Sequence, residues 1–132
     1  MPTTDPIADF LNRIRNGMRV RKPYVDIPFS RIKHELARVL LETNYIYDFA
    51  HVDEGPQGYL RVYLKYTAGG DCAIQGLRRR STPGLRRYVD HTQIPRVLNG
   101  LGTAILTTSR GVMTGGQAKK LGLGGELIAE IW

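Results

Sequence analysis

Residues 107–132, "TTSRGVMTGGQAKKLGLGGELIAEIW", carry the signals of three successive structural elements. The stretch opens on three hydroxyl residues, and after them Thr114 and Gln117 have the spacing of a capping box, which begins a helix. Gly122 is typical of a helix end. Apolar side chains then recur at every second position from 127 to 131, which is the period of a strand. The stretch therefore predicts a turn, a short helix and a closing strand.

The residues just before this stretch predict a strand that carries the hydroxyl run at its end. An apolar run ends at Leu106, and Thr107, Thr108 and Ser109 follow it directly, with Arg110 beside them. Hydroxyl side chains compete poorly with Val or Ile for a buried strand face. We therefore expect the hydroxyl run to contact a partner outside the protein.

A boundary between two halves of the chain is marked by "RRRSTPGLRRY", residues 78–88. Two arginine clusters flank a tight turn at Pro83 and Gly84. Further on, "TQIPRVLNGLG", residues 92–102, predicts a helical turn that ends at Gly100.

Two helices are expected in the N-terminal half. Thr4 or Asp5 is suited to cap the first, with Pro6 at its first position, and its apolar spacing continues to an expected stop at Gly17. After a short extended stretch, Ser30 is suited to cap the second helix.

Strands are expected at residues 45–52, 59–66 and 72–77, separated by the turns "GPQG" and "AGGD". They form an antiparallel meander on which the two helices pack. The sequence thus predicts an α+β fold of two small subdomains. Residues 1–77 place helices on the meander, and residues 78–132 form a strand-rich half with short helices.

The charge balance points to a polyanionic partner. There are 19 Lys and Arg residues against 12 Asp and Glu, a net charge of +7, and the basic residues fall in two blocks separated by an acidic stretch. Such segregation concentrates positive potential, although a solvated basic face without a partner is the alternative. Arg31 and Lys33 stand at the start of the second helix, where cations oppose the helix dipole unless an anion lies nearby.

The sequence also indicates the cellular compartment and argues against a metal site. The single cysteine, Cys72, and the lack of a signal-peptide pattern or a long apolar run favour a soluble, reduced, cytosolic protein without a membrane segment. His34, His51 and His91 lie far apart in the chain and form no short metal motif. We therefore expect no metal, no cofactor and no enzymatic activity.

The loop "GLGGE", residues 122–126, is superficially similar to a phosphate-binding loop. It has no GK[ST] and precedes a strand, so close backbone approach is the simpler explanation of its glycines. Glu126 either orients Arg or Tyr side chains, or receives base amino groups, or is a solvated carboxylate. A phosphate-ligand enzyme and a DNA-binding regulator remain as alternatives, the latter without visible helix-turn-helix spacing.

Three segments together resemble a known family. "DPIADFLNRIRNG" near the start, "STPGLRRY" in the middle and the closing stretch from 107 to 132 are similar to the bacterial small-subunit ribosomal protein numbered eight, the S-eight family. The likeness runs from Asp5 to Trp132. It implies a non-enzymatic, two-subdomain primary rRNA-binding protein that binds a helical junction in the central domain of small-subunit rRNA and supports subunit assembly. It also implies neighbouring ribosomal proteins as partners and, in many bacteria, repression of the protein's own operon mRNA.

The resemblance also implies a set of RNA-binding residues, chiefly in the C-terminal half. A-form RNA presents 2′-hydroxyls in a shallow minor groove, which short donor and acceptor side chains fit at close range. Gly115 and Gly116 depart from the family's usual charged pair, so we expect the helix after them to be less firmly held. The candidates are Thr107, Thr108, Ser109, Arg110, Tyr88, Arg86, Arg87, Gly124, Gly125 and Glu126, with Thr4, Asp5, Ser30, Arg31 and Lys33 in the N-terminal half.

Overall fold

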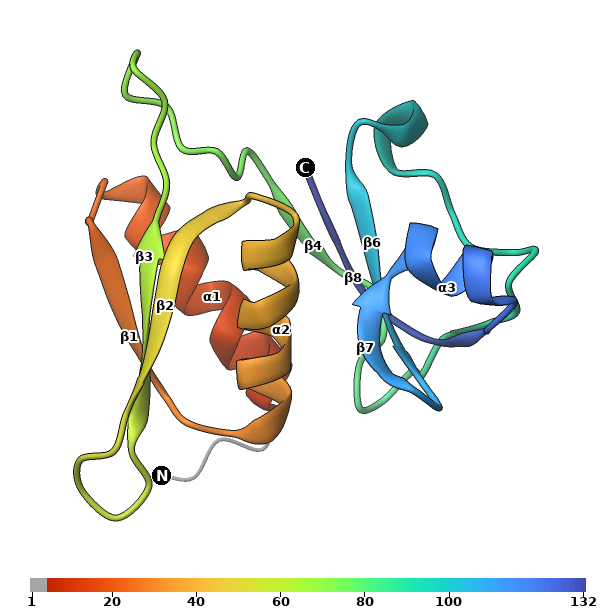
Figure 1. Cartoon of the computed structure of the whole chain (residues 1–132), viewed down its shortest axis with the longest axis horizontal. Helices are drawn as coiled ribbons and strands as arrows, with labels where there is room; N and C mark the ends of the chain where they lie inside the picture. The colour runs from red at the N-terminus through yellow and green to blue at the C-terminus, as the bar shows by residue number, and fades with distance from the viewer. Residues whose placement is uncertain (1–4) are drawn as a thin grey trace. The chain divides into compact units, whose positions relative to one another are not determined.

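The computed structural model describes residues 5–132, in two compact units that meet in sequence between Ile74 and Gln75. Each unit combines helices with an antiparallel sheet (Figure 1), so the α+β class expected from the sequence is confirmed. No helix among residues 5–132 is long and apolar enough to cross a lipid bilayer.

The N-terminal unit places two helices on a three-stranded sheet. Its elements are α1 (Pro6–Arg19), β1 (Tyr24–Pro28), α2 (Arg31–Glu42), β2 (Ile46–Val52) and β3 (Tyr59–Leu64). The strands run antiparallel in the order β1-β3-β2, and both helices lie on the same side of the sheet (Figure 1). Burial of apolar side chains between these two layers stabilises the unit. The core includes Phe10, Ile14, Ile27, Leu36, Leu40 and Leu60.

Both long helices begin where the sequence predicts. Asp5 accepts a hydrogen bond from the amide of Ala8 at 3.2 Å, and Ser30 accepts one from the amide of Lys33 at 3.3 Å. These bonds satisfy amides that the first helical turn leaves without a partner. The expected caps are confirmed, and both side chains are committed to the protein's own backbone.

The expected stop of α1 at Gly17 is wrong, because the helix continues to Arg19. Gly17 is buried inside the helix, where an added Cβ would lie 2.4 Å from Cγ1 of Val25 in β1. The glycine is therefore required for close approach of the helix to the strand rather than for a helix end.

The third strand of the N-terminal sheet also differs from the expectation. The predicted strand at residues 72–77 is not part of it; the sheet is completed by β1, which pairs with β3 from Tyr24↔Tyr63 to Pro28↔Tyr59. The amides of Gln75 and Gly76 instead both donate to the carbonyl oxygen of Trp132, at 2.7 and 2.9 Å. These hydrogen bonds to the far end of the chain draw the segment into the C-terminal unit.

The C-terminal unit is built on a five-stranded antiparallel sheet. Its elements are β4 (Leu77–Arg79), β5 (Tyr88–Val89), η1 (Val97–Gly100), β6 (Thr103–Thr108), β7 (Gly111–Thr114), α3 (Gly115–Leu121) and β8 (Gly125–Ile131). The strand order is β4-β8-β6-β7, and β5 pairs with β8. A cluster of buried side chains from the sheet, η1 and α3 forms the core of this unit: Val97, Ala104, Leu106, Met113, Ala118 and Leu127.

The helix predicted between the hydroxyl run and the closing strand is confirmed, with its caps. Thr114 accepts from the amide of Gln117, and Gln117 accepts from the amide of Thr114, both at 3.2 Å. Gly122 ends the helix in the left-handed conformation at φ 67°. Gly115 is buried, and an added Cβ would lie 2.8 Å from Cγ2 of Ile94, so this position needs glycine for packing.

Candidate nucleic-acid interface

The hydroxyl run lies at the tip of the hairpin formed by β6 and β7. Thr107 pairs with Val112 and Thr108 with Gly111, which leaves Ser109 and Arg110 exposed in the turn. The Thr108 hydroxyl donates to the carbonyl of Gly111 at 2.9 Å and accepts from the amide of Arg110 at 3.1 Å. Thr108 therefore shapes the turn, and Ser109 is the alcohol that the turn presents to solvent.

Three of the expected residues form a row across neighbouring strands. Thr107 of β6 pairs with Glu126 of β8, and Glu126 pairs with Tyr88 of β5. Residues paired in this way point to the same face of a sheet. Tyr88 is 71% exposed, and Thr107 is half-buried. The row thus combines a phenol, a carboxylate and an alcohol at one end of the sheet.

Glu126 is held in place by a serine and an arginine. Its Oε2 accepts from Oγ of Ser81 at 2.5 Å and from NH1 of Arg86 at 3.0 Å. Burial raises the pKa of Glu126, but the hydrogen bonds from Ser81 and Arg86 and the nearby positive charges outweigh burial, so its pKa lies below the ordinary value. The prediction that Glu126 orients an arginine is confirmed for Arg86, and the solvated-carboxylate alternative is wrong.

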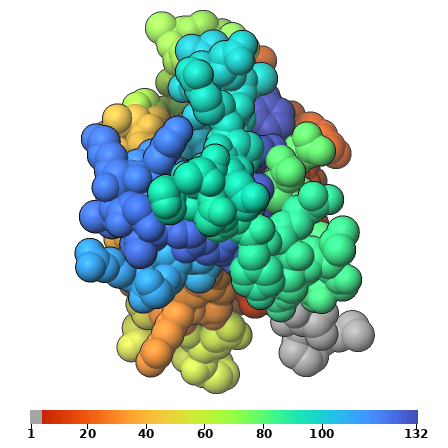
Figure 2. Space-filling model, turned by 90° about the vertical axis from the view of Figure 1, so that its right-hand side faces the viewer, coloured from red at the N-terminus to blue at the C-terminus, as the bar shows by residue number. Residues whose placement is uncertain are grey.

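Ser81 is the residue of this site that sequence reasoning missed. It is 1% exposed, and besides donating to Glu126 its hydroxyl accepts from the amide of Arg87 at 3.2 Å. One buried hydroxyl thereby ties the arginine-rich loop to β8. Its only sequence signal is its place between the two arginine clusters. Figure 2 shows that this loop (green) and the segment around η1 (teal) form part of the surface of the C-terminal unit, next to its last elements (blue).

The glycines before Glu126 have a packing role. An added Cβ at Gly125 would lie 2.2 Å from the carbonyl oxygen of Thr107, and one at Gly124 would lie 2.4 Å from that of Val89. Close backbone approach therefore explains both, as the sequence predicts. The loop leads from α3 into a strand, so the phosphate-binding alternative gains no support from its context.

In the N-terminal unit, Lys33 departs from the expectation of an RNA contact. Its side chain is 3% exposed, and Nζ donates to Oδ2 of Asp9 at 2.8 Å and to the carbonyl of Pro28 at 3.0 Å. The anion that offsets a cation at the start of α2 is therefore a carboxylate of α1. Arg31 remains exposed, and Thr4 lies outside the described residues.

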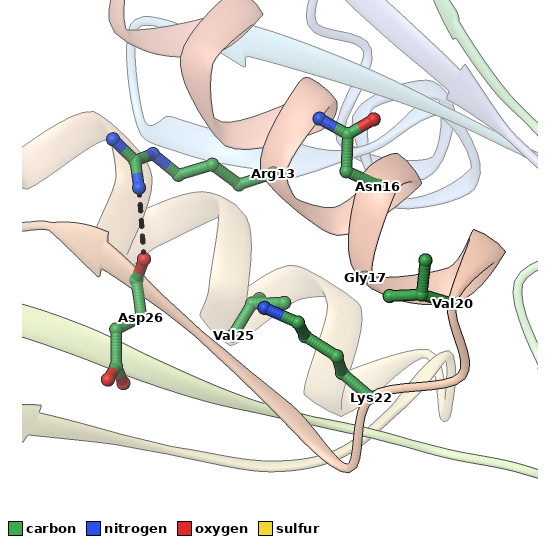
Figure 3. Close-up of a pocket in the computed structure, with 7 residues that line it drawn as sticks. All are labelled: Arg13, Asn16, Gly17, Val20, Lys22, Val25 and Asp26. Carbon is green, nitrogen blue, oxygen red and sulfur yellow. Dashed lines mark hydrogen bonds between the residues drawn. The ribbon is translucent and has the colours of Figure 1, made fainter.

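A groove beside the end of α1 is lined by two basic side chains, Arg13 and Lys22, and by apolar residues (Figure 3). It has a volume of about 410 Å³, and Arg13 at its edge donates to the carbonyl of Asp26 at 3.3 Å. Lys22 lines the groove from the loop after α1 and is exposed. The floor is apolar, and the full lining is Arg13, Asn16, Gly17, Val20, Lys22, Val25 and Asp26. The polar face of α1 thus adjoins a hollow rather than a flat surface.

The described part of the chain shows no metal centre and no helix-turn-helix. No group of three His, Cys, Asp or Glu residues within 5–132 is placed to hold a metal ion. The two long helices are separated by β1. The thiol of Cys72 is partly buried, and burial raises its pKa, so this thiol is a poor nucleophile.

Comparisons with known proteins agree over the whole described chain. The family model for ribosomal protein S8 matches residues 5–132. Proteins named small ribosomal subunit protein uS8 from Syntrophomonas wolfei, Syntrophobacter fumaroxidans and Brevibacillus brevis are 53%, 52% and 52% identical over 132 residues, covering all of both chains. The family match and these relatives define a ribosomal protein of the small subunit, located in the cytoplasm with the ribosome, and not an enzyme. The chain belongs to the ribosomal protein S8 family.

Proposed function

We propose that this protein is a primary rRNA-binding protein that binds a helical junction in the central domain of small-subunit rRNA, chiefly through its C-terminal domain. The observation that carries the proposal is the alignment of Thr107, Glu126 and Tyr88 in one row, next to the exposed tip at Ser109 and Arg110. Alcohol, phenol and guanidinium groups at one end of a sheet match the 2′-hydroxyls, base edges and phosphates of an irregular RNA helix.

The roles of the site residues follow from their contacts. Ser109 and Thr107 offer hydroxyls that both donate and accept, and Arg110 offers a cation to a phosphate. Thr108 acts as a positioning residue, since its hydroxyl already closes the turn. Tyr88 offers an exposed ring for a ribose or base. Gly124 and Gly125 allow the close approach of neighbouring backbones, and Glu126 orients the side chain of Arg86.

The arginine-rich loop before β5 holds the guanidinium of Arg86 in a fixed orientation. Arg86 is half exposed while its guanidinium is anchored on Glu126. A guanidinium fixed in this way loses less side-chain entropy when it meets a phosphate. Arg87, exposed beside it, has its backbone amide fixed by Ser81. We assign both arginines to the RNA surface.

The N-terminal unit contributes fewer contacts than the resemblance implies. Asp5 and Ser30 cap helices, and Lys33 is buried against Asp9. Arg31 is exposed and is the member of this group that we assign to RNA.

The decisive experiment is the substitution Ser109→Ala in the full chain, titrated against a central-domain fragment of small-subunit rRNA. We expect a loss of about 1–2 kcal/mol, because a polar group of the RNA is left without its partner. Thr67→Ala, which removes an exposed hydroxyl from the N-terminal unit, is the matched control and leaves the affinity unchanged. Equal affinity of the Ser109 variant and the wild type contradicts the proposal, as does equal competition by duplex DNA.

Assembly and operon control follow from the same surface. We expect small-subunit reconstitution to slow with the Ser109→Ala protein and not with the Thr67→Ala protein. Neighbouring ribosomal proteins are the further partners that this role implies. We also propose that the surface binds a similar structure in the protein's own operon mRNA. A translational reporter that carries this mRNA should be repressed by the wild type and less by the Ser109 variant; equal repression contradicts this step.

A further inference from the structure

A second hollow in the N-terminal unit is lined by aromatic and imidazole rings. It has a volume of about 280 Å³, and its walls come from the start of α2, the residue before its cap and the end of β2. The lining residues are Phe29, Arg31, His34, Glu35 and His51. None of the rings belongs to the RNA-binding residues proposed above.

The rings form one ordered cluster. Phe29 and His51 stack with centroids 4.1 Å apart and planes 7° from parallel. His34 stands edge-on to Phe29 at 6.2 Å and to Phe49 at 5.3 Å. The hollow thus has a face made by a stacked pair and a side made by an imidazole inclined to that pair, at 64° to Phe29 and 69° to His51.

The backbone of Phe29, one member of the stacked pair, is fixed by two hydrogen bonds. The amide of Phe29 donates to the carbonyl of Gly58 at 3.1 Å, and the carbonyl of Phe29 accepts from Nε2 of Gln57 at 2.5 Å. Both partners lie in the loop between β2 and β3, and His51 is in β2. Phe29 is thus held through its backbone and His51 through its strand, so the stacked rings need little reorganisation before they bind a flat ligand.

Polar groups stand at the edge of the same hollow. Arg38 donates to Oε2 of Glu35 through Nε at 3.0 Å and NH2 at 2.8 Å, while Oε1 of Glu35 lies 3.9 Å from Nδ1 of His34. Arg31 is exposed on the first turn of α2. The hollow therefore combines a π face, a carboxylate oxygen, imidazole nitrogens and a cation.

We propose that this hollow binds an unpaired purine base of the RNA, stacked on the Phe29–His51 pair, with a base N–H donated to Glu35 and the adjoining phosphate next to Arg31. This inference rests on the function proposed above. Base stacking on aromatic side chains is the common way in which proteins bind splayed nucleotides. An apolar side chain of a partner protein would desolvate Glu35 and the imidazoles without replacing their hydrogen bonds. A purine supplies both the flat face and the polar edge.

The test is base-by-base chemical probing of small-subunit rRNA bound to the full-length protein, with reagents that modify unpaired purines. We expect the wild type to protect one unpaired purine that becomes reactive again with His51→Ala or Phe29→Ala, while the other protections persist. Loss of one stack lowers affinity by about 5- to 150-fold. Replacing that purine by an abasic nucleotide should abolish the difference between the wild type and the His51→Ala protein.

Two further variants separate stacking from a folding defect. His51→Tyr keeps a ring at this position and should restore the protection. Tyr47→Ala removes a 73% exposed ring from the same strand, outside the hollow, and should change nothing. The proposal is overturned if no purine depends on His51, if Tyr47→Ala acts equally, or if His51→Ala impairs only the joining of other ribosomal proteins. If the wild type binds RNA in a Ser109-dependent manner yet none of its purines depends on His51, this proposal fails alone; if it does not bind the RNA, the proposed function fails as well.

Discussion

Exchanging Asp9 for asparagine should destabilise the N-terminal unit far more than exchanging its partner Lys33 for methionine. Lys33 is almost fully buried, and its ammonium is held by Asp9 at 2.8 Å and the carbonyl of Pro28 at 3.0 Å. Removing the carboxylate leaves a buried cation with only neutral partners. Removing the lysine instead leaves Asp9 paired with Arg13 at 2.9 Å.

The magnitude follows from burial. Breaking a buried ion pair by deleting one partner costs about 3–5 kcal/mol. Asp9 retains 15% side-chain exposure, and an amide oxygen still accepts a hydrogen bond, so we expect about 2–3 kcal/mol for Asp9→Asn. An apolar side chain of similar length in place of Lys33 should cost less than about 1 kcal/mol, since replacing buried charge by packed apolar atoms is often close to neutral.

Urea denaturation followed by far-ultraviolet circular dichroism measures both variants. The helical signal reports mainly on the N-terminal unit, because α1 and α2 are the two longest helices of residues 5–132. The double variant should resemble Lys33→Met alone, since the stranded cation is then gone. Lys33→Met should also leave rRNA affinity and its salt dependence unchanged. Equal destabilisation by the two single variants would show that Lys33 is not a buried cation that depends on Asp9, and a weaker salt dependence in Lys33→Met would show that Lys33 contacts phosphate.

Three further outcomes are expected. The pKa of Glu126 in the folded protein lies below the ordinary 4.5. The ionised Glu126 therefore contributes its full free energy to stability above pH 4.5, and this contribution is lost as the pH falls through the pKa of the folded state. In acid titration, the Glu126→Gln protein should lose stability less steeply than the wild type. Arg110→Gln should reduce the slope of log affinity against log salt by about 0.7–0.9, and an unchanged slope would exclude a phosphate contact. Gly125→Ala should cost about 1–3 kcal/mol in denaturant titration, because the new methyl group meets the carbonyl of Thr107. Gly116→Ala, whose Cβ would touch only a threonine hydroxyl at 4.0 Å, is its control and should not destabilise.

Local signals in the sequence predict most of the element boundaries. A helix cap depends on residues three positions apart, so Asp5, Ser30 and the Thr114–Gln117 box can all be recognised without knowing the fold. The strand that ends in the hydroxyl run is likewise predicted by its own composition. These features need no contact with distant parts of the chain.

Pairings between distant residues account for the errors. Gly17 has the spacing of a helix stop, yet its use depends on Val25 of a strand that follows it. Lys33 has the pattern of a surface cation, yet Asp9, 24 residues earlier, buries it. Ser81 lies 45 residues from Glu126. Nothing in the spacing of residues along the chain encodes such partners, and they become visible only when the strands and helices are packed.

The same pairings decide how the net charge of +7 acts on RNA. Ion pairs hold several of the cations that composition counts: Arg13 and Lys33 on Asp9, Arg38 on Glu35 and Glu42, Arg61 on Asp26, Arg80 on Glu130, and Arg86 on Glu126. Binding releases counterions that are condensed on the RNA. A protein cation that already faces a carboxylate displaces fewer of them when it meets a phosphate, because its charge is partly compensated. Salt dependence of binding should therefore fall well below that expected from 19 basic residues. The ion pairs instead fix the orientation of the cations. Glu126 holds the Arg86 guanidinium at the end of the sheet, where Ser81 also donates to Glu126 and fixes the loop that carries Arg86. Fit between fixed donors and a folded RNA, more than total charge, then sets which RNA is bound.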